Sequence, residues 1–175
     1  MLIRIYNHFL APKIRLARAS AAARSSGLLA FQVLGGNMEP TLRLGEVALY
    51  KRQEPSSLCL GDVVTLAHQS YFEGVKVPLR IVGLAGDRVE LKAGQLYLNG
   101  QVNPEPYQLT AAAESEYSRD FPCTSVPEAH AFLLGDCRDN SKDSRLLGPI
   151  PFAALVGKIV LVHPLDNPRE QRPVR

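Results

Sequence analysis

The apolar positions along most of the chain follow the spacing of β-strands. Short apolar or alternating runs recur from residue 28 onward, separated by turns that contain glycine, proline or asparagine. Such runs, rich in β-branched and aromatic side chains, predict strands. The predicted strands are Leu29–Leu34, Glu46–Tyr50, Asp62–His68, Leu79–Leu84, Val89–Leu91, Gln95–Leu98, Gln101–Val102, His130–Leu134 and Gly157–His163. Residues 28–163 show almost no helical spacing, so the pattern predicts one mainly β domain, built as a barrel or a coiled antiparallel sheet.

Local signals differ in strength along this domain. The dipeptide Asn99-Gly100, set between alternating residues, predicts a tight hairpin because a type I′ turn needs positive φ at both positions. Residues 103–125 contain three prolines and no clear period, and we expect a long irregular excursion there. Residues 164–175 form a polar tail that we expect to be disordered.

Residues 1–27 form a separate, basic arm. Apolar residues lie at near-helical spacing before Pro12, and an Ala/Arg-rich stretch favours helix again after it. The sequence leaves three roles open for this amphipathic arm: a helix on an anionic membrane surface, an organelle-targeting peptide, or a helix that docks on its own domain.

The net charge of +3 comes from this arm. Residues 1–38 hold five basic residues and no acidic one, which leaves fifteen basic and seventeen acidic residues for the rest of the chain. A folded body without excess positive charge argues against a nucleic-acid partner.

The sequence indicates no metal site, cofactor or membrane span. The three cysteines (Cys59, Cys123 and Cys137) and the four histidines lack the spacing of zinc ligands, and a disulfide between two of the cysteines stays open. The longest uncharged run near the start, Ser25–Met38, has 14 residues, three of them glycine. A spanning helix needs roughly 20 apolar residues, so the chain as given is not expected to span a bilayer.

A stiff loop follows the first strand. Gly35 and Gly36 permit unusual backbone geometry, and Pro40 fixes its own φ and restricts Glu39. Such a loop presents one side chain in a set direction, and that residue is Asn37.

The most polar stretch, residues 135–145, follows an apolar strand. Three aspartates alternate there with Arg138, Lys142 and Arg145. In isolation this composition fits a solvated loop, whereas the alternation suggests internal ion pairs.

Four segments, taken in order, resemble the sequence boxes of type I signal peptidases. They are Asn-Met-Glu-Pro-Thr-Leu from Asn37, Leu-Gly-Asp-Val-Val at 60–64, Arg-Ile-Val-Gly-Leu-Ala-Gly-Asp-Arg-Val-Glu at 80–90, and Gly-Asp-Cys-Arg-Asp-Asn-Ser-Lys-Asp-Ser-Arg-Leu-Leu-Gly-Pro-Ile at 135–150. Their order and separations make a chance match very unlikely. The resemblance implies a coiled-sheet β domain that binds an extended peptide or preprotein segment.

The same resemblance implies a serine nucleophile and a lysine base at two positions that are substituted here. In the family a desolvated, neutral lysine takes the proton of the attacking serine hydroxyl. The serine position is Asn37 and the lysine position is Leu79. A carboxamide is not a nucleophile at neutral pH and an isobutyl group accepts no proton. Lys76, three residues before Leu79, is a poor replacement because an odd offset on a strand points the other way.

The other residues carried over from the family are supporting ones. Gly35, Gly36 and Asn37 would form the oxyanion region, Ser141 would orient the lysine amine, and Asp143 with Arg145 would pin the loop by an ion pair. The remaining supporting residues of the boxes are Met38, Pro40, Arg80, Gly83, Gly86, Asp87, Gly135, Asp136, Arg138 and Asn140.

Three functional hypotheses follow. The first is an inactive relative that binds an extended segment by strand addition next to the Leu79–Leu84 edge. The second is an active endopeptidase that cleaves after small residues with an unrecognised nucleophile and base, and the third is a purely structural subunit. The family implies a site at the extracytoplasmic face of a membrane, whereas the sequence shows neither a spanning helix nor an export signal.

Overall fold

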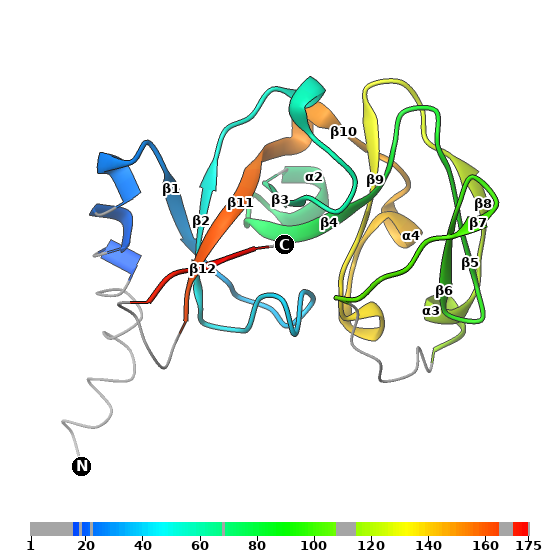
Figure 1. Cartoon of the computed structure of the whole chain (residues 1–175), viewed down its shortest axis with the longest axis horizontal. Coiled ribbons are helices and arrows are strands. Elements are labelled where there is room, and N and C mark those ends of the chain that lie inside the picture. Colours follow the sequence, from blue (N-terminus) through cyan, green and yellow to red (C-terminus); the bar gives the residue numbers. More distant parts are fainter. Residues whose placement is uncertain are drawn as a thin grey trace, which may run out of the picture.

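A computed structural model describes residues 16–17, 19–21, 23–67, 69–107, 115–164 and 170–174. Antiparallel strands dominate it (Figure 1). The strands are β1 (Leu29–Gln32), β2 (Val47–Lys51), β3 (Val63–Leu66), β4 (Val77–Leu84), β5 (Arg88–Lys92), β6 (Gln95–Leu98), β7 (Gln101–Val102), β8 (Phe121–Ser125), β9 (His130–Leu134), β10 (Ile150–Pro151), β11 (Leu155–His163) and β12 (Arg172–Pro173). The predicted mainly β fold is confirmed.

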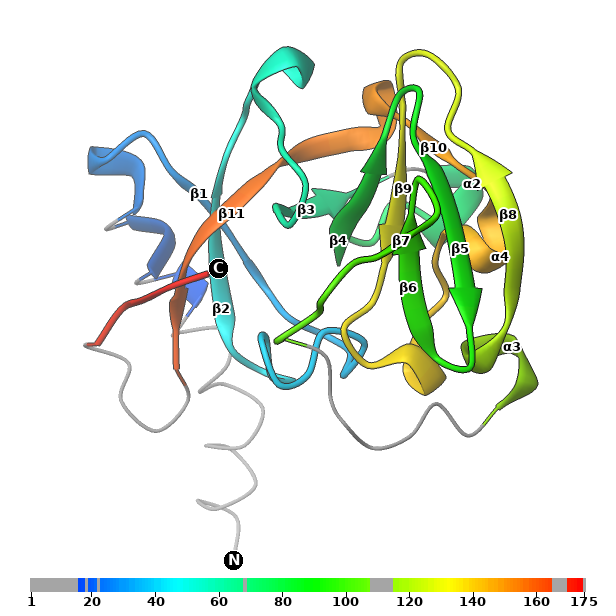
Figure 2. The same ribbon diagram turned by 45° about the vertical axis from the view of Figure 1, so that its right-hand side comes forward.

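The larger sheet forms a curled half-barrel. Its strand order is β1-β2-β11-β3-β4-β9-β10, and β12 pairs with β11 beside this path. Both Figure 1 and Figure 2 show the long β11 crossing the molecule from β2 towards β10. The pairing of β11 shifts register between Leu155 and Gly157 and again between Ile159 and Leu161. Such irregularities increase strand bending, which helps the sheet to curl.

The smaller sheet has the order β7-β6-β5-β8, and it comes forward in Figure 2. β6 and β7 are joined by the predicted hairpin, in which Asn99 has φ 54° and Gly100 has φ 83°. Positive φ at both turn positions is the geometry that the Asn-Gly pair predicts.

Regular helix is short in the β domain. The α-helices α2 (Gln69–Phe72), α3 (Glu116–Arg119) and α4 (Ser144–Leu147) have four residues each, and the 3₁₀ turns are η1 (Pro55–Ser57), η2 (Arg138–Asn140) and η3 (Phe152–Ala154). These elements connect strands and carry little of the core.

Strand β2 is buried on both faces, which explains its continuous apolar sequence. Ala48 and Tyr50 point into the main core, whereas Val47 and Leu49 face the arm. The described arm residues between 16 and 25 are helical, and Ala19 packs against β2 from this side. This contact is the one that docking on its own domain requires, while residues 1–15 lie outside the described residues.

Two expectations about irregular segments are wrong in part. The excursion of residues 103–125 contains α3 and β8, and β8 pairs with β5 as an outer strand of the smaller sheet. An outer strand tolerates Pro122 because one of its edges needs no backbone donor. The polar tail is also not wholly disordered, since β12 pairs with β11 and Arg172 forms an ion pair with Glu46.

Two further features bear on the open questions of the sequence. Cys59 and Cys123 are exposed and Cys137 is half-buried, and all three are free thiols. Within the described ranges, no helix is both long and apolar enough to cross a membrane.

Candidate functional site

The stiff loop after β1 brings Asn37 to the edge of β4. The Asn37 carboxamide donates from Nδ2 to the Pro78 carbonyl over 2.6 Å, 41 residues away in sequence. Its Oδ1 lies back over Gly35, 3.3 Å from where a Cβ on that glycine would stand. The Asn37 carbonyl accepts a hydrogen bond of 3.0 Å from the Cys137 backbone N–H. The two positions that the family resemblance pairs, 37 and 79, therefore lie next to each other across Pro78.

Leu79 lies in a closed apolar environment. Its side chain is 0% exposed and belongs to the buried cluster that includes Val64, Leu66, Ile81 and Leu133. Val64 is also its cross-strand partner on β3. The isobutyl group is thus satisfied by aliphatic neighbours, and the position offers neither a proton acceptor nor solvent.

Close to the Asn37 loop lies a buried hydroxyl, that of Ser141, without a hydrogen-bond partner among the described residues. Ser141 is 8% exposed, and its Oγ lacks a partner among the described residues. A Cβ placed on Gly135 would lie 2.5 Å from Ser141 Cβ and 2.6 Å from the Asn37 carbonyl oxygen. Only glycine fits at position 135, and it allows Ser141 and the Asn37 backbone to flank it. An unpartnered buried hydroxyl is uncommon and costly.

The ion pair expected between Asp143 and Arg145 is present and fully buried. Arg145 donates from Nε to Asp143 Oδ1 over 2.9 Å and from Nη2 to Oδ2 over 2.8 Å. Asp143 also accepts from the Gly135 backbone N–H, and Arg145 donates to the Arg138 carbonyl. The pair therefore ties both ends of the 135–145 loop together, so this stretch is not a solvated loop.

Tyr117 covers this ion pair. The Arg145 guanidinium lies over the Tyr117 ring, 4.1 Å from its centre, and the Tyr117 hydroxyl donates to the Ser141 carbonyl. Burial raises the pKa of the Tyr117 hydroxyl to about 12, and the Asp143 carboxylate adds to the shift because it opposes a second negative charge.

A second buried ion pair joins β4 to the same loop. Arg80 donates from Nε and Nη2 to the two carboxylate oxygens of Asp136, over 2.8 and 2.7 Å. Arg80 also donates to the Gly61 carbonyl, and Thr41 Oγ1 donates to Asp136 over 2.5 Å. Thr41 belongs to the Asn37 loop, so this network fixes that loop, β4 and the polar loop relative to one another.

The excursion after β7 completes the network. The Arg80 guanidinium stacks on the Tyr107 ring at 3.7 Å, and Arg138 forms a buried ion pair with Glu105. Burial raises the pKa of the Tyr107 hydroxyl well above its usual range, with the Glu105 carboxylate adding to the effect. Sequence reasoning missed Glu105 and Tyr107 because nothing in the irregular excursion indicates that it covers the site.

Other predicted supporting residues fall into two groups. Met38 is fully buried in the core, the Glu39-Pro40 bond is cis, and Asn140 Nδ2 lies 3.2 Å from where a Cβ on Gly36 would stand. By contrast, Gly86 and Asp87 lie in the β4–β5 turn, where Asp87 Oδ2 accepts from the Leu84 N–H over 2.9 Å. That turn leads to the smaller sheet and does not meet Asn37. Gly83 lies in β4, where a Cβ would stand 2.5 Å from Val89 Cγ2.

Three lysines and the Thr41 hydroxyl are engaged with other groups. Lys142 donates to the Tyr71 carbonyl over 3.2 Å, Lys158 pairs with Asp62 and Lys92 pairs with Glu90. The Thr41 hydroxyl is bound to Asp136. In the part of the chain that the structure describes, no three His, Cys, Asp or Glu side chains gather closely enough to hold a metal ion.

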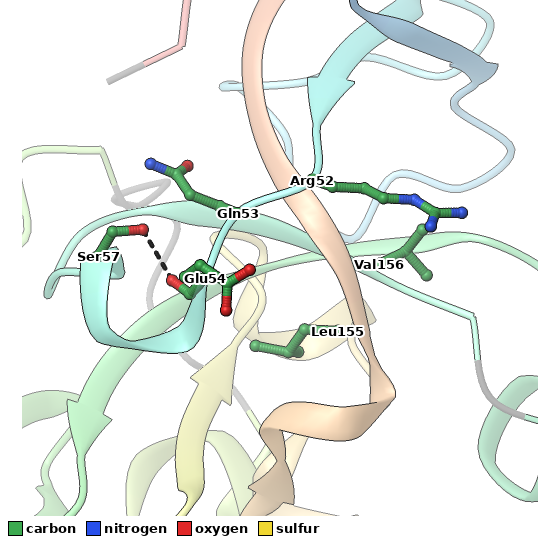
Figure 3. Close-up of a pocket in the computed structure, with 6 residues that line it drawn as sticks. All are labelled: Arg52, Gln53, Glu54, Ser57, Leu155 and Val156. Atoms are coloured by element: carbon green, nitrogen blue, oxygen red, sulfur yellow. Dashed lines mark hydrogen bonds between the residues drawn. The ribbon is translucent and has the colours of Figure 1, made fainter.

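The hollow drawn in Figure 3 is separate from this site. It has a volume of about 700 Å³ and lies between η1 and the start of β11. Its lining residues are Arg52, Gln53, Glu54, Ser57, Leu155 and Val156. None of them belongs to the Asn37 network.

The stretch of β4 that was expected to receive a peptide, Leu79–Leu84, is mostly paired with other parts of the domain. β9 pairs with Arg80–Leu84 on one side, and Ile81 exchanges backbone bonds with Asp62 and Gly61 on the other, so the Leu79–Leu84 stretch is mostly occupied. The ladder with β9 begins only at Arg80, and β3 pairs with Val77–Leu79 on the opposite side. Among the described residues, no strand pairs with Val77–Leu79 on the β9 side, and the Pro78 carbonyl there accepts from the Asn37 amide.

Comparisons with known proteins show the family of this chain. A sequence model of the family described as “Signal peptidase, peptidase S26” matches residues 8–163. Signal peptidase I of Bacillus licheniformis is 35% identical over 122 residues, a match that covers 66% of this chain and 64% of that protein. Signal peptidase IB of Staphylococcus aureus (strain COL) is 32% identical over 147 residues and covers 74% of each chain.

The structure is similar to a crystal structure of a signal peptidase I from Enterococcus faecalis V583. The TM-score is 0.51 at 29% identity, and the superposition covers 62% of this chain and 98% of that one. This similarity agrees with the mainly β fold and its curled antiparallel sheet. The chain belongs to the type I signal peptidase family.

Proposed function

We propose that this chain binds extended signal- or leader-type peptides, or a partner in secretion or assembly, without cleaving them. The observation that carries the proposal is the pair of substitutions at one location: the Asn37 amide bonded to the Pro78 carbonyl, beside Leu79 packed among aliphatic side chains. Nucleophilic cleavage needs a hydroxyl and a base within hydrogen-bond reach of it. Neither position supplies either group.

The unpartnered Ser141 hydroxyl supports the same conclusion. Its Oγ is buried next to Gly135 and the Asn37 backbone without a hydrogen-bond partner among the described residues. In the family resemblance this serine orients the lysine amine, so an apolar residue at position 79 leaves it orphaned. The surrounding ion pairs remain complete, which supports a retained scaffold around a lost reaction centre.

Peptide binding would use the open edge of β4. An extended segment next to Val77–Leu79 would add a strand there, with main-chain hydrogen bonds giving affinity. It must compete with the Asn37 amide for the Pro78 carbonyl. The proposal therefore predicts that Asn37→Ala, which frees this acceptor, strengthens binding rather than weakening it.

A cleavage and binding assay tests the proposal. A fluorescent preprotein segment with an Ala-x-Ala signal end is incubated with the wild type, with Asn37→Ser plus Leu79→Lys, and with Asn37→Ala plus Leu79→Met. The last pair is close in size to serine and lysine but supplies neither hydroxyl nor amine, so it is the matched control for the second variant. Anisotropy reports binding and mass spectrometry reports cleavage.

We expect binding by all three proteins and cleavage by the Ser/Lys double change alone. Cleavage by the wild type would establish an active endopeptidase and overturn the proposal. Absence of binding by every protein would favour a purely structural subunit. Binding without any gain of cleavage in the double change would contradict the assignment of positions 37 and 79 to the dyad.

A further inference from the structure

The segment of residues 170–174 is bound to the domain as an added strand. Along one edge of β11, pairing with β3 ends at Lys158. On the same edge, β12 then pairs with Leu161 and Val162. The Val174 N–H donates to the Val160 carbonyl over 3.2 Å, which extends the backbone pairing by one residue. This is the main-chain pattern of strand addition, here within one chain (Figure 1).

Two side chains of this segment enter prepared positions. Arg172 donates from Nη2 to Glu46 Oε2 over 2.8 Å, and Glu46 is only 3% exposed. Val174, two residues on, packs against the core cluster that contains Val33 and Met38. Alternate residues of an added strand point to the same side, so the site selects an arginine and, two residues later, an aliphatic side chain.

The acceptor is built independently of its occupant. The Arg43 backbone N–H also donates to Glu46 Oε2 over 2.9 Å, and the backbone of Glu46 bonds to Val33 and Arg43. These contacts lie within the 33–46 loop and hold the carboxylate at the edge of the sheet. The occupant itself is held by a two-residue ladder, and Gln171 and Pro173 are exposed. Short, exposed elements of this kind open at low free-energy cost.

We propose that the β11 edge at Val160–Val162, the Glu46 carboxylate and the adjoining core cluster form a second peptide-acceptor site. It takes an extended segment of a partner protein with an Arg-x-aliphatic pattern, in exchange for residues 170–174. This site lies across the half-barrel sheet from the Val77–Leu79 edge, on a different strand. Selectivity at this second site depends on Glu46, so the proposal does not depend on whether the Asn37 site binds a peptide.

The test uses the full chain and a peptide with the sequence of residues 170–174, Glu-Gln-Arg-Pro-Val. Backbone amide NMR shifts locate the bound peptide and give its affinity, even when binding is weak. The proteins are the wild type, a variant with Arg172→Ala and Val174→Ala, and that variant with Glu46→Gln added. Two control peptides carry glutamate in place of the arginine or aspartate in place of the valine.

We expect the peptide to bind the Arg172→Ala, Val174→Ala variant at least about tenfold more tightly than the wild type, because internal competition is removed. The shifts should centre on Val160–Val162, and Glu46→Gln or either control peptide should weaken binding by about tenfold or more. Two results would overturn the proposal: no peptide-induced shifts in the variant with Arg172→Ala and Val174→Ala, or a peptide affinity that Glu46→Gln leaves unchanged. Shifts centred on Val77–Leu79 would also overturn it, since they would place the peptide in the site of the proposed function.

Discussion

Replacing Leu79 with lysine would place an ammonium group where solvent is excluded. The native side chain is 0% exposed among aliphatic neighbours on β3, β4 and β9. The lysine stem can keep much of the apolar contact, so the main cost is desolvation of the amine. Protein mutational data put that cost at about 1 to 3 kcal/mol for a polar group.

The family resemblance implies Ser141 as the partner of the new amine. Ser141 Oγ is buried without a hydrogen-bond partner among the described residues, and a hydrogen bond to it would recover about 0.5 to 1.5 kcal/mol. We therefore expect Leu79→Lys alone to lower the free energy of unfolding by about 0.5 to 2 kcal/mol at pH 7, and Leu79→Lys combined with Ser141→Ala to lower it by about 1 to 3 kcal/mol. The matched control Leu79→Met, which conserves volume, should cost less than about 1.5 kcal/mol.

The loss should depend on pH with a defined sign. A desolvated lysine has a pKa below that of the unfolded chain, so the unfolded state binds more protons and stability rises with pH. The difference between Leu79→Lys and the wild type should shrink between pH 7 and about pH 10. Urea unfolding at several pH values measures it. A Leu79→Lys variant as stable as the wild type at pH 7, or a difference that does not change with pH, would refute this account of the site.

Three further changes test the scaffold. Asp136→Ala should cost about 3 to 5 kcal/mol because it removes the carboxylate that pairs with the buried Arg80 guanidinium. Arg80→Met added to it should recover part of the loss in a double-mutant cycle of urea unfolding, and a double loss equal to the sum of the two single losses would argue against coupling. Gly135→Ala should lower stability by about 1 to 3 kcal/mol, because the added Cβ would collide with Ser141 and the Asn37 backbone. The loss should appear as a lower melting temperature. An unchanged melting temperature would contradict the close approach of Ser141 and Asn37 to Gly135. Because the pKa of Tyr117 is raised in the folded state, its contribution to stability is complete below pH 10 and falls as the pH rises towards about 12. Tyr117→Phe should therefore reduce the loss of stability between pH 9 and pH 11, measured by urea unfolding. An equal loss in the wild type and in Tyr117→Phe would exclude the effect.

The sequence predicted those parts of the fold whose cause is local. Asn99-Gly100 forms its turn because two positive φ values are a property of those residues, and nine strands were located by alternation or apolar runs. β8 was missed because Pro122 and half-exposed positions conceal an outer strand. β12 was missed because its stability comes from pairing with β11 and from Glu46, 126 residues before Arg172.

The candidate site divides in the same way. The proximity of positions 37 and 79 and the Asp143–Arg145 ion pair both followed from the family resemblance. The cover over the site could not be predicted, because Glu105 meets Arg138 across 33 residues from a segment without periodicity. The occupation of most of Leu79–Leu84 by other strands was not predicted, since the extent of β4 pairing with β3 and β9 is set by the three-dimensional register.

The central claim is that the wild-type chain binds a signal-type peptide without cleaving it. The most direct measurement is mass spectrometry of a preprotein ending its signal in Ala-x-Ala, incubated with excess wild-type protein under conditions in which anisotropy shows it to be bound. The account predicts intact preprotein throughout, over a time in which Asn37→Ser plus Leu79→Lys yields a cut after the final small residue. A cut by the wild type at that residue, abolished by Asn37→Ala, would contradict it.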